Sequence, residues 1–69
     1  MPIIEVHIAQ GRSMDAKRQL FKGITNAAVE SLGVKPEQVR IILREIDEGH
    51  FAVGGEPKLN VFGIADAAE

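Results

Sequence analysis

The chain has 69 residues, of which 45% are hydrophobic and 26% charged, and it contains no cysteine. This length predicts one domain over residues 1–69 and excludes a second. A net charge of -2 excludes the basic patch of a nucleic-acid-binding protein, and no apolar run approaches the roughly 18 residues of a membrane span. Because the N-terminus also lacks a signal-peptide pattern, we expect a cytoplasmic protein with neither a nucleic-acid nor a membrane partner.

So short a chain needs an additional source of stability, because a single core below about 70–80 residues leaves only a few kcal/mol. Disulfides are excluded by the absence of cysteine. No metal site is expected, since His7 and His50 are far apart in the sequence and no thiolate is present. Association of several copies is therefore the expected stabiliser.

The first half of the chain predicts a strand followed by a helix. Residues Ile3 to Ala9 alternate apolar and polar side chains, as a half-buried strand does. Ser13 is placed as the N-cap of a helix, and Gly33 as its C-cap before Pro36. The apolar residues recur at helical spacing and predict the core face: Ala16, Leu20, Ile24, Ala27, Ala28 and Leu32.

The second half predicts another strand, from Val39 to Ile46, parallel to the first and joined to it by the helix. The glycines around residues 50–53 predict a short hairpin or bend. Residues 57–69 are interpreted as an extension of uncertain structure. The fold class is thus α+β, a β-α-β protomer whose single helix covers one sheet face and leaves Ile42 and Ile46 for a neighbouring copy.

Pro2 is the first candidate for chemistry, because a small second residue usually permits removal of Met1 and exposes a secondary amine. A polypeptide α-amino group titrates near 7.7–8.0, and desolvation or a nearby cation lowers this value toward neutrality. Such an amine is suited to general acid and base work. The alternative is a proline that only begins an edge strand.

Three arginines are candidates for binding an anion. Arg12 lies in the loop after the first strand, while Arg40 and Arg44 share the face of the second strand that the helix does not cover. Two guanidinium groups separated by a pocket suit a dicarboxylate, or a carboxylate and a developing enolate. Taken singly, each arginine is also compatible with a solvated or ion-paired role, and spacing alone does not choose between Arg40 and Arg44.

Phe51 lies in the glycine-bounded segment, where it either pins the hairpin or forms an apolar wall that excludes water from the amine. His7 and His50 have no sequence neighbours at metal-ligand or catalytic spacing, so we interpret them as non-functional histidines.

Together, MPIIEVHIAQGRS, the VRIIL strand and the GHFAVGG segment resemble the 4-oxalocrotonate (2-hydroxymuconate) tautomerases of the tautomerase superfamily. The resemblance covers about residues 2–56. It implies a homohexamer built as a trimer of dimers, without a metal or organic cofactor, acting on a small anionic carboxylate or dicarboxylate. It also implies that Pro2 is the acid and base, that Arg40 binds the oxygen end of the substrate, that Arg12 holds the far carboxylate and that Phe51 lines the pocket.

We therefore expect an isomerase that interconverts the enol and keto forms of a 2-hydroxydienoate such as 2-hydroxymuconate, in the degradation of aromatic compounds. Two alternatives stay open at this point. One is a superfamily relative that hydrates a halogenated acrylate, a reaction that needs a further carboxylate to activate water. The other is a non-catalytic oligomeric module that binds an anionic metabolite.

Overall fold

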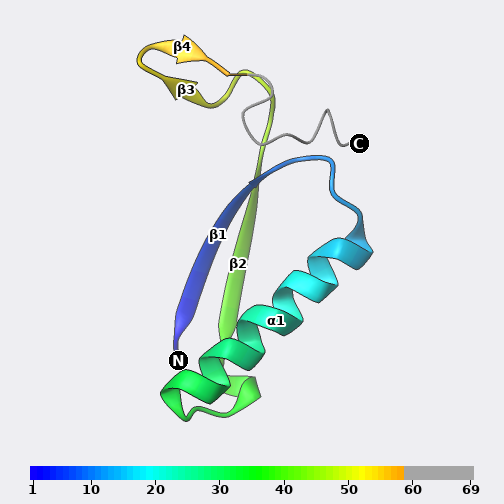
Figure 1. The fold of residues 1–69 in the computed structure, drawn as a ribbon, viewed down its shortest axis with the longest axis vertical. Coiled ribbons are helices and arrows are strands. Elements are labelled where there is room, and N and C mark those ends of the chain that lie inside the picture. Colours follow the sequence, from blue (N-terminus) through cyan, green and yellow to red (C-terminus); the bar gives the residue numbers. More distant parts are fainter. Residues whose placement is uncertain (59–69) are drawn as a thin grey trace.

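The computed structural model describes residues 1–58, so the expected extension lies almost wholly outside the described residues. The elements follow the order β1 (Ile3–Ala9), α1 (Met14–Leu32), the short 3-10 helix η1 (Pro36–Gln38), β2 (Arg40–Ile46), β3 (Ala52–Val53) and β4 (Glu56–Pro57). This order confirms the predicted β-α-β protomer with a short hairpin, and β2 begins one residue later than expected (Figure 1).

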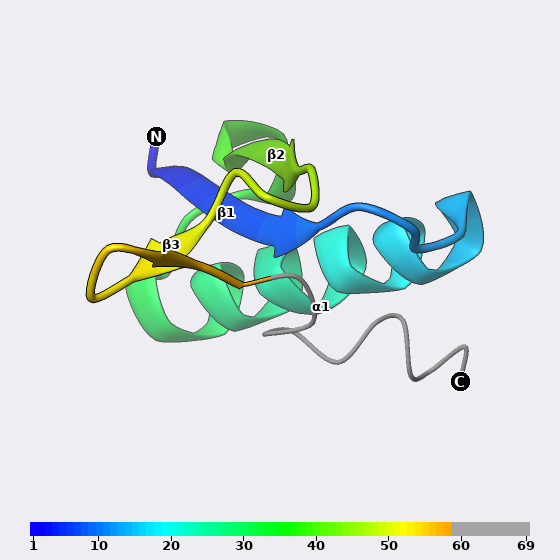
Figure 2. The same cartoon turned by 90° about the horizontal axis from the view of Figure 1, so that it is seen from above.

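The two long strands form a parallel pair. The register runs from Ile3 opposite Arg40 to Ala9 opposite Ile46, and α1 makes the crossover that a parallel pair requires. Figure 2 shows α1 lying along one face of this sheet. The β3–β4 hairpin is a separate antiparallel pair, which follows β2 at the carboxyl edge of the main sheet (Figure 1).

Both ends of α1 are capped as the sequence predicts. The hydroxyl of Ser13 accepts a hydrogen bond from the backbone N–H of Ala16 at 3.0 Å. At the other end Gly33 adopts a left-handed conformation, with φ 69°, and its N–H donates to the carbonyl of Val29 at 3.0 Å. These caps fix the length of α1 at 19 residues.

The buried stripe of α1 differs from the predicted one. Ala28 is buried and Leu20 and Ile24 are half-buried, but the predicted core residues Ala16, Ala27 and Leu32 are exposed. The stripe is rotated toward half-buried positions that the prediction omitted: Lys17, Phe21, Thr25 and Val29. The larger apolar areas of the omitted Phe and Val side chains outweigh the methyl groups of two alanines in deciding which face packs on the sheet.

The protomer has little core of its own. Ala28 is the one apolar residue classed as buried among the described residues. Ile42 is 41% exposed, as predicted, and Ile3 is 56% exposed, whereas Ile46, which was also expected to be uncovered, is half-buried. Within residues 1–58, no helix is both long enough and apolar enough to cross a membrane.

Candidate active site

Pro2 and Arg40 meet at the amino edge of the sheet, where both strands begin. The backbone N–H of Arg40 donates to the carbonyl oxygen of Pro2 at 3.0 Å. Pro2 is half-buried, whereas Met1 beyond it is 64% exposed. Removal of Met1 would therefore leave the Pro2 nitrogen at a partly desolvated strand end, one register position from an arginine.

The side chain of Arg40 is held back against the turn that precedes β2. Its Nη1 donates to the carbonyl oxygen of Glu37 at 2.8 Å, and the side chain makes no ion pair with a described residue. A guanidinium has five N–H donors in a planar fork, so the remaining donors are available to an oxygen anion.

Arg44 lies farther along β2, opposite His7 in the register. The four residues between Arg40 and Arg44 correspond to about 13 Å of strand. Arg44 is therefore not beside Pro2, whereas the backbone of Arg40 is. The sequence alone did not distinguish these two arginines because both occupy the same face.

Arg12 lies at the opposite edge. It follows the carboxyl end of β1, and a strand of seven residues spans about 20 Å. Phe51 follows the carboxyl end of the neighbouring strand β2 and is half-buried, with its carbonyl accepting a hydrogen bond from the N–H of Lys58 at 2.8 Å. One protomer thus has Pro2 and Arg40 at one edge of the sheet, and Arg12 and Phe51 at the other.

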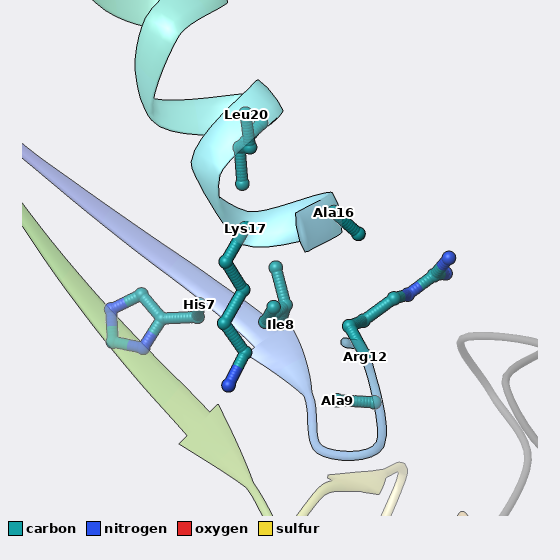
Figure 3. A pocket seen from close by; sticks show the side chains of 7 residues that line it. All are labelled: His7, Ile8, Ala9, Arg12, Ala16, Lys17 and Leu20. Atoms are coloured by element: carbon teal, nitrogen blue, oxygen red, sulfur yellow. The ribbon is translucent and has the colours of Figure 1, made fainter. Parts of the chain in front are cut away.

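A pocket of about 330 Å³ opens beside Arg12, between the end of β1 and the first turns of α1. Figure 3 shows Ile8 and Leu20 approaching one another across it, with Arg12 on the side of Ala16. The seven lining residues are His7, Ile8, Ala9, Arg12, Ala16, Lys17 and Leu20. This volume is at the lower end of the range for small-molecule sites.

The sequence interpretation missed an ion pair at this pocket, between Lys17 Nζ and a carboxylate oxygen of Glu45. The Lys17 side chain is 19% exposed, so the pair is partly withdrawn from water. A signal for it existed, because Glu45 occupies the parity of β2 that carries Ile41 and Leu43 toward the helix. A charged residue at such a position needs a partner.

The two histidines lie away from the amine. His7 is on β1 opposite Arg44, and His50 Nδ1 lies 4.0 Å from Asp47 Oδ2 in the turn after β2. Among residues 1–58 there is no group of three or more His, Cys, Asp or Glu side chains arranged to hold a metal ion.

The structure is thus a β-α-β protomer with a proline before its first strand and an arginine at each end of the sheet. The family model described as tautomerase enzyme matches residues 2–59. The chain belongs to the tautomerase family, and it is an isomerase.

Known relatives agree with this assignment. A probable tautomerase of Ralstonia nicotianae is 45% identical over 58 residues, covering 84% of this chain and 83% of that protein. A 2-hydroxymuconate tautomerase of Pseudomonas putida is 42% identical over 62 residues, covering 87% and 98%. The solved heterohexamer 4-oxalocrotonate tautomerase of Chloroflexus aurantiacus is 30% identical with a TM-score of 0.76, covering 83% of this chain and 92% of that one.

Proposed function

We propose that this isomerase converts a 2-hydroxydienoate such as 2-hydroxymuconate into its conjugated 2-oxo isomer, in the cytoplasmic degradation of aromatic compounds. The observation that carries the proposal is the meeting of Pro2 and Arg40 at one edge of the sheet. The name of the Pseudomonas putida relative supports this choice of substrate.

The reaction needs one group that takes a proton and returns it at another atom. After removal of Met1, the secondary amine of Pro2 accepts the proton of the 2-hydroxyl group and delivers it to a carbon of the conjugated chain. Negative charge grows on the oxygen end of the substrate as the hydroxyl proton leaves. Arg40 stabilises this charge, while Arg12 holds the distant carboxylate through a bidentate contact and Phe51 forms an apolar wall.

The complete site requires more than one copy of the chain. Arg12 and Pro2 of one protomer lie beyond opposite ends of β1, which spans about 20 Å. Packing two protomers with their strands in opposite directions brings the carboxyl edge of one to the amino edge of the other. The exposed Ile3 and Ile42 supply apolar surface for further association, and a homohexamer made as a trimer of dimers satisfies both requirements.

The first experiment combines the mass of the intact protein with an ultraviolet assay of 2-hydroxymuconate on the same sample. A mass without Met1 together with rapid isomerisation is expected. Undiminished activity with Met1 retained would exclude the proline amine as the base. Inactivity without Met1 would exclude this substrate, and halide release from a 3-haloacrylate would then identify the hydratase alternative.

A second experiment tests whether the site is shared between chains. Pro2→Leu, which retains Met1 and so has no amine at residue 2, and Arg12→Ala are unfolded, mixed in equal amounts and refolded together. If each site takes Pro2 and Arg12 from different chains, random assembly regenerates about a quarter of the sites with both residues intact. Activity that stays at the level of the two separate variants would show that both residues act from one chain.

A further inference from the structure

The loop that carries Arg12 is fastened to β2 on both of its sides. Before the loop, the backbone N–H of Gln10 donates to the carbonyl oxygen of Ile46 at 3.1 Å. After the loop, Lys17 near the start of α1 forms an ion pair with Glu45, the residue that precedes Ile46 on β2. Figure 3 shows the Lys17 side chain extending from α1 toward the strands. Two consecutive residues of one strand therefore hold the end of β1 and the beginning of α1.

Arg12 itself has an exposed side chain that makes no hydrogen bond or ion pair with any other residue in the described part of the chain. Gly11, directly before it, has a φ of 114°, a conformation that glycine adopts without steric cost. The place of the guanidinium is thus determined by the loop backbone over residues 10–13 and by the contacts that hold this backbone to the sheet.

The Lys17–Glu45 ion pair is the less exposed of two ion pairs near the start of α1. Its side chains are 19% and 36% exposed, respectively. In the neighbouring pair, Arg18 and Asp15 are 67% and 83% exposed. A solvated pair contributes little because water screens it, whereas a partly desolvated charge that loses its partner has to move toward water. Loss of either Lys17 or Glu45 should therefore shift the start of α1 relative to β2.

We propose that Lys17 and Glu45 are positioning residues for Arg12, and that their ion pair holds the guanidinium where it can bind the substrate carboxylate. Neither side chain touches the substrate in this role. The inference rests on the proposed function, since it assumes that Arg12 binds that carboxylate. It goes further by assigning to the binding of substrate two residues that act through Arg12 alone.

The test measures kcat and KM for 2-hydroxymuconate in Lys17→Met, which keeps an aliphatic stem and removes the charge. KM should rise by about 3- to 10-fold, because a displaced guanidinium keeps part of its contact with the carboxylate, and kcat should stay within about twofold. Glu45→Gln should give a similar rise, and it provides a second variant if Lys17→Met does not fold. If Lys17 instead bound the carboxylate directly, Glu45→Gln would free its ammonium group and lower KM, and that outcome would overturn the inference.

A double-mutant cycle distinguishes positioning of Arg12 from a general loss of structure. In the Arg12→Ala background, Lys17→Met should change kcat/KM by less than about twofold, because the side chain through which Lys17 acts is gone. Effects of the two substitutions that add in full would show that Lys17 acts independently of Arg12, which contradicts the inference.

Arg18→Met is the matched control, because it removes a cation from the exposed ion pair one residue farther along α1. It should leave KM unchanged, and a rise equal to that of Lys17→Met would also contradict the inference. Lys17→Arg keeps a cation opposite Glu45, so its KM should lie nearer the original value than that of Lys17→Met. An unmodified enzyme inactive toward 2-hydroxymuconate, or an Arg12→Ala variant with unchanged kinetics, would instead refute the proposed function, on which the inference depends.

Discussion

The two edges of the β1–β2 sheet differ in what they can do alone. At the amino edge, Pro2 and Arg40 are joined by a backbone hydrogen bond of 3.0 Å and are half-buried and exposed, respectively. At the carboxyl edge, Arg12 lies beside a pocket of about 330 Å³. The amino edge thus brings together the residues proposed for proton transfer, and the carboxyl edge brings together the arginine proposed for carboxylate binding and a pocket.

Parallel pairing produces this separation. Because both strands run in the same direction, everything that precedes a strand gathers at one edge and everything that follows a strand gathers at the other. A protomer of this topology divides its functional residues by chain position, and association between copies reunites them.

The largest expected effect comes from removing the base at the amino edge. Replacement Pro2→Leu should lower kcat/KM for 2-hydroxymuconate by about 10²- to 10⁴-fold, the usual contribution of a general acid or base. A large second residue retains Met1, so residue 2 then has an amide nitrogen in place of the amine. The oligomer should stay intact, as size-exclusion chromatography would show. Turnover at the original rate would remove Pro2 from the mechanism.

Arg40→Ala should have the next largest effect, and mainly on kcat. If Arg40 stabilises charge that grows in the transition state, its loss lowers kcat by about 10²- to 10³-fold with a smaller change in KM. Arg44→Ala is the matched control on the same strand face and should change kcat little. A rise in KM with unchanged kcat in Arg40→Ala would mean that this side chain only binds substrate.

At the carboxyl edge, replacement of Arg12 should mainly weaken substrate binding. Arg12→Ala removes a charge-assisted contact worth about 1.5–3 kcal/mol, which corresponds to about a 10- to 150-fold rise in KM. Steady-state kinetics on 2-hydroxymuconate measure this rise. An equal loss in kcat, with KM unchanged, would place Arg12 at the reacting atoms and contradict the division between the edges.

The sequence predicted the order of elements because each had a local signal. The alternation in β1, the cap at Ser13 and the left-handed Gly33 depend on neighbouring residues alone, and all three are confirmed. The prediction of which face of α1 packs on the sheet was partly wrong, because packing against the sheet decides between helix faces of similar apolar content. Exposed Ala16 and half-buried Lys17 show the result.

The candidate site could be predicted less completely than the fold from the sequence. Arg40 and Arg44 share one parity of β2, and only the register placed Arg40 next to Pro2. The pocket also had no sequence signal, since it depends on how far α1 stands from the end of β1 and on the small side chains of Ala9 and Ala16. The roles of Pro2, Arg12, Arg40 and Phe51 remain predictions.

The smallest effects should come from the two helix caps, which lie at different edges. Ser13→Ala removes the hydrogen bond to the Ala16 N–H, and Gly33→Ala forces an alanine into φ 69°. Each should lower the free energy of unfolding by about 1 kcal/mol. At Gly33 this cost is purely conformational, because an added Cβ would meet no atom within 4 Å.

The KM for 2-hydroxymuconate should distinguish Ser13→Ala from Gly33→Ala, although the two variants should have similar stability. Ser13 adjoins Arg12 and caps the turn that carries Ala16, so fraying there should raise KM for 2-hydroxymuconate by about twofold, a change of less than 1 kcal/mol. Gly33 lies at the other end of α1, and Gly33→Ala should leave KM unchanged. Chemical denaturation at one fixed protein concentration gives the stabilities, since assembly makes them concentration-dependent. Equal KM values in the two variants would show that the first turn of α1 does not position Arg12. The end of β1 alone would then determine where Arg12 lies.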